Sequence, residues 1–358
     1  MNDKPNVLFI MTDGQAAWTV GAEGNPNACT PVIDRLVSEG ARFGGMFSNA
    51  AVCSPARAAL ITGRYPSEVG FGPDGRVWLV DEQRRIDERA ATWPRVLRDH
   101  GYHTALIGKT HLGATDDLAL PHRLGYERFA GWSGGPRKSS DPVVTIDGVQ
   151  KAFPGAYTSD VLGDLTIDQG YNMGHNGIWH KGNGRWITMD RRDPAGVYPD
   201  RERPNLYDNS LRVPCVVRWP GRIAPGSRID QPTVFLDWFP TLVGMAGAPA
   251  DACPQHRGRD LGPLLLGQTQ AEWDARVFAQ HDLLRCCRTP EWKLILNAYS
   301  AQPDECYNLT NDPDEHHNLI SGGIPTAYKA ICQRLKADLL DMMEVVDDPL
   351  RDAFTGGT

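Results

Sequence analysis

The chain alternates short apolar runs with segments that carry one apolar face. Residues 6–12 form a continuous apolar run that ends at Asp13, which is typical of a strand buried on both faces of a parallel sheet. Residues 31–39 begin at a Thr-Pro pair, place their apolar side chains on one helical face and stop at Gly40. Residues 93–99 predict a second short helix.

Further strands are predicted at residues 102–107 and 211–219, and the segment from Phe235 to Val243 has a helical apolar face. Because strand, loop and helix alternate here, we predict an α/β fold with a mostly parallel central sheet flanked by helices. Ligands gather past the carboxyl ends of strands in such sheets. Polar residues follow two of the predicted strands, at Asp13 and in residues 108–113.

From about Trp273 onward the pattern changes to short strands followed by one long helix. The strands are predicted at residues 277–279, 292–296 and 305–309, and the helix at residues 328–345. We therefore predict an α/β catalytic domain over residues 1–272 and a small antiparallel α+β subdomain over residues 273–358.

The composition is that of an ordinary globular protein. The chain has 358 residues, of which 41% are hydrophobic and 23% charged, enough for one large α/β domain and a smaller appendage. Its formal net charge is −7 and it has no basic run, which argues against nucleic acid as a partner. Local positive charge suffices to bind a small anionic substrate.

The cysteines and the N-terminal residues indicate where in the cell the protein is expected. The eight cysteines include no Cys-x-x-Cys pair, so they are expected to be reduced thiols. Residues 1–5 have no basic region leading into a long apolar stretch, and residues 7–11 are too short for a signal core or a membrane span. We expect a cytoplasmic protein with no membrane partner.

The candidate chemistry centres on Cys53. The run Cys-Ser-Pro-Ala-Arg from Cys53 to Arg57 leads into an Ala-rich helical segment that closes on Gly63-Arg64. The first backbone N–H groups of a helix are unpaired and its dipole is positive there, so an anion is stabilised at this position. A nucleophile attacking an anionic ester fits such a seat, and a small buried thiol is the alternative interpretation.

The Cys-x-Pro-x-Arg run followed by Gly-Arg resembles the signature of the type I sulfatases, which have an alkaline-phosphatase-like fold. The resemblance implies that Cys53 is oxidised to formylglycine by a formylglycine-generating enzyme, and that the hydrated aldehyde is the nucleophile. It also implies that Arg57 offsets the charge on the sulfate.

Residues 108–113 (Gly-Lys-Thr-His-Leu-Gly) resemble a second sulfatase block, with Thr110 in place of an aromatic residue. By this resemblance Lys109 holds the sulfate as a point charge, and His111 hydrogen-bonds the nucleophile or a sulfate oxygen. Taken one at a time, these residues would be read as a surface lysine and a core histidine.

The resemblance also implies a metal site. Sulfatases carry metal-binding acids after the first strand, which corresponds to Asp13, although Gly14 stands where a second acid is often found. The segment Asp168-Gln169 resembles the second metal segment, and Lys181 its trailing sulfate-binding lysine. Residue 53 completes the set of ligands. Oxygen ligands suit a hard cation, calcium by resemblance, with magnesium as the alternative.

The resemblance breaks near residues 165–169. Residues 157–168 look like the start of a helix that opens a long central region in sulfatases, yet here they run straight into Gln169. The missing region normally supplies another active-site histidine, walls of the substrate pocket and the strand before the second metal aspartate. Its loss would leave neighbouring strands with unpaired backbone groups.

Three functions remain open from the sequence. The first is hydrolysis of a small-molecule or carbohydrate sulfate ester by a formylglycine hydrate, with a divalent cation. The second is hydrolysis of a phosphodiester or phosphonate monoester at the same site. The third is a shortened, catalytically silent sulfatase homologue.

Overall fold

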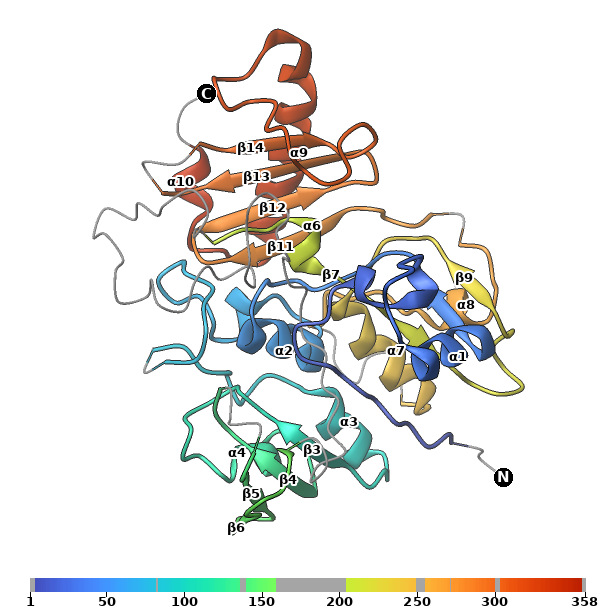
Figure 1. The fold of residues 1–358 in the computed structure, drawn as a ribbon. Helices are drawn as coiled ribbons and strands as arrows, with labels where there is room; N and C mark the ends of the chain where they lie inside the picture. The colour runs from blue at the N-terminus through green and yellow to red at the C-terminus, as the bar shows by residue number, and fades with distance from the viewer. Residues whose placement is uncertain are drawn as a thin grey trace.

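The protein is described by a computed structural model over residues 4–81, 83–135, 140–158, 204–248, 255–270, 272–299 and 303–355. Asp168, Gln169, Lys181 and the junction near residues 165–169 lie outside the described residues. An antiparallel sheet forms one end of the molecule, and the α/β body forms the rest (Figure 1). The N-terminus lies at the far end of that body from the C-terminus (Figure 1).

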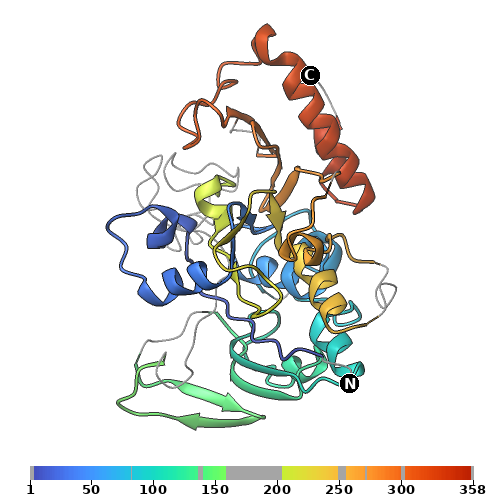
Figure 2. The same cartoon turned by 90° about the vertical axis from the view of Figure 1, so that its right-hand side faces the viewer.

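The C-terminal sheet has the strand order β11-β12-β13-β14, and all its pairs are antiparallel. The long helix α9 runs beside it, on the outside of the molecule (Figure 2). This confirms the antiparallel subdomain predicted from the sequence. The elements are β11 (Val277–His281), β12 (Leu284–Arg288), β13 (Trp292–Asn297), β14 (Glu305–Asn308), α9 (Thr326–Val345) and α10 (Arg351–Thr355).

The body contains parallel strand pairs flanked by antiparallel edges. The pairs β1–β9, β2–β10 and β3–β4 are parallel, whereas β1–β8, β2–β7, β4–β5 and β5–β6 are antiparallel. The strands are β1 (Ala41–Phe43), β2 (Met46–Phe47), β3 (Ala105–Lys109), β4 (Arg128–Trp132), β5 (Val143–Ile146), β6 (Val149–Ala152), β7 (Arg212–Val213), β8 (Val216–Val217), β9 (Ser227–Ile229) and β10 (Thr233–Val234).

Helices pack around these strands, and α2 lies in the middle of the body (Figure 1). The helices predicted at residues 31–39 and 93–99 are confirmed as α1 and α3. The α-helices are α1 (Pro31–Glu39), α2 (Cys53–Thr62), α3 (Trp93–Asp99), α4 (Leu120–Arg123), α6 (Asp208–Leu211), α7 (Trp238–Met245) and α8 (Gly262–Leu265). Short 3-10 helices are η1 (Ala17–Thr19), η2 (Gly21–Glu23), η3 (Pro66–Val69) and η6 (Phe235–Asp237).

The prediction of a strand buried on both faces at residues 6–12 is wrong. The segment forms no named strand, and Leu8 is 85% exposed. Phe9 points into the body, where its ring lies 5.8 Å from that of Trp238. Only one side of the segment is therefore covered, although both sides are apolar in sequence.

The strand predicted at residues 211–219 is divided into β7 and β8. Pro214 and Cys215 separate the two, and β7 pairs with β2 while β8 pairs with β1. Proline has no N–H to donate to a strand ladder, so the pairing stops there and the chain moves to the neighbouring sheet.

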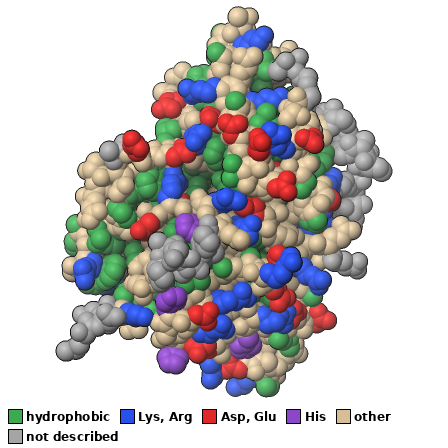
Figure 3. Space-filling model, turned by 180° about the vertical axis from the view of Figure 1, so that it is seen from behind, with side chains coloured by type: hydrophobic (Ala, Val, Ile, Leu, Met, Phe, Trp, Pro, Cys, Tyr) green, Lys and Arg blue, Asp and Glu red, His purple; other side chains and the backbone are tan. Residues whose placement is uncertain are grey.

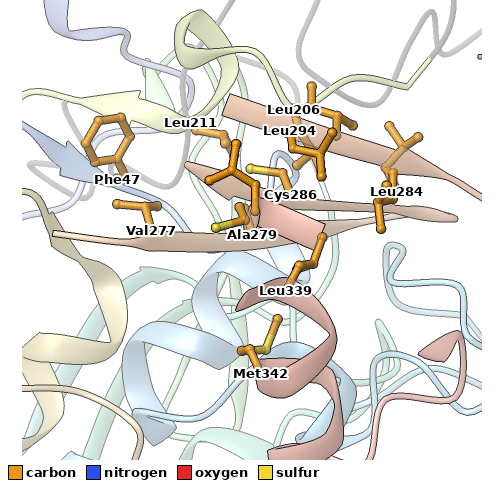
Figure 4. Close-up of a cluster of buried hydrophobic side chains, with 14 of the residues drawn as sticks. Phe47, Leu206, Leu211, Val277, Ala279, Leu284, Cys286, Leu294, Leu339 and Met342 are labelled. Atoms are coloured by element: carbon orange, nitrogen blue, oxygen red, sulfur yellow. The ribbon is translucent and has the colours of Figure 1, made fainter. Parts of the chain in front are cut away.

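One hydrophobic core joins the two parts of the molecule. Side chains from β11, β12 and β13 pack with Leu339 and Met342 of α9 on one side and with Phe47 and Leu211 of the body on the other. Figure 4 shows these side chains converging on the sheet. The C-terminal subdomain is therefore packed against the body through a shared interior.

The surface carries charges of both signs. On the face in Figure 3, acidic and basic side chains are interspersed, and apolar side chains gather toward the left-hand edge. Among the described residues, no helix combines the length and the apolar character that crossing a membrane requires. The cysteines that the structure describes are not joined in disulfides.

Candidate active site

Cys53 is the first residue of α2, and its side chain is almost completely buried, at 2% exposure. Every residue of this helix is buried. The helix ends at Gly63, where φ is 65° and a Cβ would lie 2.6 Å from Cβ of Phe239. The glycine of the Gly-Arg pair is thus required by backbone conformation and close packing. Cys53 sits where the sequence predicted it, at the positive end of a buried helix.

Arg57 connects α2 to the end of β3. It lies one helical turn after Cys53, and its Nη1 donates a hydrogen bond of 2.8 Å to the carbonyl oxygen of Lys109. The Arg57 side chain is buried, which makes this contact a fixed link between the two elements. The helix that carries Cys53 is therefore held to the strand that carries Lys109.

Lys109 connects the end of β3 to Asp13. Its Nζ donates a hydrogen bond of 2.8 Å to Oδ2 of Asp13, and the lysine side chain is only 3% exposed. The Asp13 side chain is 37% exposed, so the carboxylate lies at the edge of the buried region. A buried ammonium needs such a partner. The alternative interpretation of Lys109 as a surface lysine is excluded.

His111 follows two residues after Lys109 and is also buried. Its backbone has a φ of 53°, in the left-handed region, and its N–H donates to the carbonyl of Ser133 at 3.0 Å. Non-glycine residues in this region are uncommon and cluster at functional sites. The β3–β4 pairing thus carries both Lys109 and His111 to the end of the sheet.

Sequence reasoning missed Trp78 and His281. Trp78 packs with Cys53 in a small apolar cluster that includes Val52 and Leu79. Its ring stacks on the His281 imidazole, with centroids 5.0 Å apart and an interplanar angle of 12°. The sequence did contain a signal for His281, because it is a polar residue just after a predicted short strand. The same criterion singled out Asp13.

The donor set for a metal is partly described. Asp13 supplies a carboxylate at the edge of the buried region, whereas Asp168 and Gln169 fall outside the described residues, as does Lys181. Within the described part of the chain, no group of three or more His, Cys, Asp or Glu residues that could hold a metal ion is found. Asp13 fits a hard cation as one oxygen ligand, and the other ligands remain predictions.

Comparison with known proteins identifies two family models along the chain. A model described as Sulfatase matches residues 5–169, and one described as N-sulphoglucosamine sulphohydrolase, C-terminal, matches residues 198–345. The first includes Asp13, Cys53 and Lys109. The second covers the antiparallel sheet, α9 and the segment that precedes them.

Relatives that align over most of their length are also named as sulfatases. Arylsulfatase A of Bos taurus is 36% identical over 451 residues, covering 94% of this chain and 87% of the relative. Arylsulfatase A of Homo sapiens is 25% identical and covers 93% and 86%. Since 94% of this chain is about 337 residues, about 114 of the 451 positions aligned with the bovine protein have no counterpart here.

Solved structures show the same fold. The structure of BT4656 in complex with its substrate D-glucosamine-2-N,6-O-disulfate superimposes with a TM-score of 0.74 at 18% identity, covering 98% of this chain and 99% of that one. A phosphonate monoester hydrolase from Silicibacter pomeroyi gives 0.67 at 16% identity, with 96% of each chain covered.

The predicted α/β fold of the alkaline-phosphatase type is confirmed by these structures. The family models and the bovine relative carry the assignment further, because they match the chain almost from end to end. On these grounds the chain belongs to the type I sulfatases, a family of sulfuric ester hydrolases.

Proposed function

We propose that the protein hydrolyses a sulfate ester with a nucleophile made from Cys53. The observation that carries this proposal is the chain of contacts from Cys53 along α2 to Arg57, from Arg57 to Lys109, and from Lys109 to Asp13. These contacts join the seat of the nucleophile to a buried cation and a carboxylate, which are the parts that transfer of an anionic group requires.

Each of the site residues has a role in the proposed reaction. The N-terminus of α2 directs the positive end of its dipole toward the anion at residue 53. Lys109 and Arg57 supply positive charge that offsets the charge on the sulfate oxygens. His111 assists proton transfer. Lys181 is proposed as a second sulfate contact by resemblance.

Conversion of Cys53 to formylglycine by a formylglycine-generating enzyme is part of the proposal. The hydrated aldehyde supplies a hydroxyl that attacks sulfur, the S–O bond to the alcohol breaks, and loss of a proton from the second hydroxyl re-forms the aldehyde and expels sulfate. A thiol buried at a helix start fits the precursor position, because the modified residue then lies inside the site.

A divalent cation is proposed at Asp13, with Asp168, Gln169 and residue 53 as the other ligands. Calcium is the proposed ion, with magnesium as the alternative, since the donors are oxygens. When bound, it supplies positive charge for the sulfate oxygens. The contact with Lys109 holds the Asp13 carboxylate at the edge of the buried region, where it is 37% exposed.

The proposed substrate class is a sulfated carbohydrate. Two findings support it: the match of residues 198–345 to the N-sulphoglucosamine sulphohydrolase C-terminal model, and the likeness to a structure bound to D-glucosamine-2-N,6-O-disulfate. Hydrolysis of a phosphonate monoester is the second candidate, which the likeness to the Silicibacter pomeroyi enzyme supports.

A substrate panel tests the proposal. The chain is co-expressed with a formylglycine-generating enzyme, conversion at residue 53 is measured by mass, and hydrolysis is assayed with calcium present. An aryl sulfate, glucosamine sulfates, a phosphodiester and a phosphonate monoester are compared by kcat/KM.

The proposal predicts the highest kcat/KM for a sulfate ester. A preference for the phosphonate would favour the second candidate. Full conversion without hydrolysis of any ester would support the catalytically silent homologue.

A further inference from the structure

The segment that leads into Cys53 is tied to the C-terminal subdomain by Asn49. The side chain of Asn49 is fully buried, and its Nδ2 donates a hydrogen bond of 3.0 Å to the carbonyl of Phe278 in β11. The Asn49 carbonyl accepts a hydrogen bond of 2.9 Å from the N–H of Gln280. Two contacts thus fix this residue to one strand.

Asn49 also contacts the body. Its Oδ1 accepts a hydrogen bond of 3.3 Å from the N–H of Leu236 in η6. The neighbouring Ser48 donates its N–H to the carbonyl of Leu211 at 2.8 Å. The segment before α2 is therefore hydrogen-bonded to η6, α6 and β11. The buried side-chain amide of Asn49 makes the contacts with η6 and β11.

The same end of β11 supports the wall beside Cys53. Trp78, a member of the buried apolar cluster that contains Cys53, stacks on His281, the residue after Gln280. The strand-like pairing of Val77 with Asp282 holds this contact, with N–H to carbonyl distances of 3.2 Å and 2.8 Å. One strand thus contacts both the chain before Cys53 and a side chain of the apolar cluster that contains Cys53.

We propose that Asn49 is a positioning residue for the reaction, fixing residue 53 against β11 so that the C-terminal subdomain takes part in turnover. This inference rests on the proposed function of Cys53. Only three residues separate Asn49 from Cys53, so a shift of the buried amide is passed on to the start of α2. A misplacement of about 1 Å is enough to reduce a rate by about a hundredfold.

Asn49→Ala tests the proposal, with Asn205→Ala as the matched control. Asn205 is also a buried asparagine, and its Oδ1 accepts hydrogen bonds from the Tyr207 N–H at 3.3 Å and the Ser210 hydroxyl at 2.8 Å. Both variants are co-expressed with the formylglycine-generating enzyme. Conversion, thermal midpoint, kcat and KM for an aryl sulfate are measured for each.

Both substitutions are expected to lower the thermal midpoint, because each leaves buried groups unpaired. Only Asn49→Ala is expected to lower kcat, by about ten- to a hundredfold with KM within about twofold of the wild type. A merely structural role would not separate kcat from KM in this way. A kcat for folded, converted Asn49→Ala equal to that of Asn205→Ala would overturn the proposal.

Asn49→Asp provides a second variant of nearly the same shape. A neutral carboxyl group can donate to the Phe278 carbonyl and accept from the Leu236 N–H, as the amide does, whereas the carboxylate cannot donate. Burial raises the pKa of such an acid. The ratio of its kcat to that of the wild type is therefore expected to increase as pH falls.

Nearby titrating groups are common to both proteins. On the packed elements these are Asp237 of η6, paired with Arg259, and His281 of β11. Taking the ratio to the wild type at each pH cancels their contribution. A ratio that stays at one across the range would contradict the proposal, also in the case where Asn49→Ala does not fold.

The experiments distinguish a wrong function from a wrong role for Asn49. If the fully converted wild type hydrolyses no sulfate ester, the proposed function is wrong and the role of Asn49 falls with it. If the wild type is active and the Asn49 variants keep its kcat, only the role of Asn49 is wrong.

Discussion

At the scale of single residues, Lys109 is the point where the site is joined together. Its carbonyl accepts the hydrogen bond from Arg57, and its ammonium donates to Asp13. The side chain is almost entirely buried, so its charge is shielded little by solvent and acts strongly on a neighbouring anion. Sequence resemblance identified Lys109, and the structure adds that it also carries a structural contact through its backbone.

Lys109→Ala is expected to reduce kcat/KM for a sulfate ester by about a hundredfold, the size of effect seen when one preformed charge-stabilising donor is removed. Lys329→Ala on the exposed surface of α9 is the control and is expected to leave kcat/KM unchanged. Steady-state kinetics of converted protein measures both. Equal activity of the two variants would remove Lys109 from the proposed mechanism.

At the scale of elements, the segment at residues 4–12 shows what an apolar pattern can and cannot predict. Phe9 and Met11 pack into the core of the body, as a strand interpretation requires. Leu8 and Ile10 face outward at 85% and 49% exposure, and Ile107 of β3 is 55% exposed. An apolar run therefore does not by itself show that both of its sides are buried.

Substitutions at two adjacent residues are expected to change the free energy of unfolding by very different amounts. Phe9→Ala removes an aromatic ring that contacts Trp93 and Trp238, and it should lower the free energy of unfolding by about 3 kcal/mol. Leu8→Ala removes an exposed side chain and should change it by less than about 0.5 kcal/mol. Urea unfolding monitored by fluorescence compares them. A large loss with Leu8→Ala would mean that its outer side is covered in solution.

Elements such as α1, α3 and β13 could be predicted from the sequence because their limits are set locally. A Thr-Pro pair and Gly40 bound α1, and the strand β13 follows its own apolar run. The covering of residues 6–12 was mispredicted because burial depends on other segments, and apolar residues alone do not say whether a covering layer is present. Pro214 was the local signal that should have divided the strand predicted at 211–219.

The site was predictable to a similar degree. Blocks of residues located Cys53, Arg57, Lys109, His111 and Asp13, and the structure joins Arg57, Lys109 and Asp13 through two hydrogen bonds. Asn49 acts through backbone carbonyls and N–H groups more than 180 residues away, so no local pattern marks it. Asp168, Gln169 and Lys181 stay predictions, as does the cytoplasmic location.

At the scale of the whole molecule, the body and the C-terminal subdomain share both a core and a buried charge cluster. Lys293 of β13 donates from Nζ to Asp208 of α6 at 2.8 Å and to Glu315 at 2.7 Å. Glu315 also accepts a hydrogen bond of 2.6 Å from the Asp208 N–H. Ionised groups buried this deeply are stable only while the two parts stay together.

The boundary predicted at residues 272 and 273 can be tested by truncation. A chain that ends at residue 272 would expose Phe47 and Leu211, whose partners in the shared core are removed, and would leave Asp208 without Lys293. We expect this fragment to lack cooperative thermal unfolding. Cooperative unfolding of residues 1–272 would show that the body is an independent domain.

The charge cluster predicts a pH dependence of stability. Burial raises the pKa of Glu315 to about 7 despite the lowering effect of Lys293, whereas the ordinary value in an unfolded chain is about 4.3. The stability from Glu315 is therefore fully present below about pH 4.3 and is lost as pH rises toward 7. For Asp208, burial raises the pKa, but the lowering by Lys293 and Arg288 is larger, so the pKa lies below its ordinary value. The contribution of Asp208 to stability is therefore lost only as pH falls below that ordinary value.

Glu315→Gln should remove the part of this dependence that lies between about pH 4.3 and 7. The free energy of unfolding of the wild type, relative to that of Glu315→Gln, is expected to decrease across this range. Urea unfolding at several pH values measures the difference. A difference that is constant with pH would show that Glu315 titrates at its ordinary value.

The central claim is that turnover depends on formylglycine at residue 53, and one measurement tests it most directly. Preparations with different degrees of conversion are made by varying the amount of formylglycine-generating enzyme, and the converted fraction is read from the mass of the peptide that contains Cys53. The rate of aryl sulfate hydrolysis is then plotted against that fraction. The account predicts a straight line through zero, with Cys53→Ala at the origin. A rate independent of conversion, or none at full conversion, would contradict it.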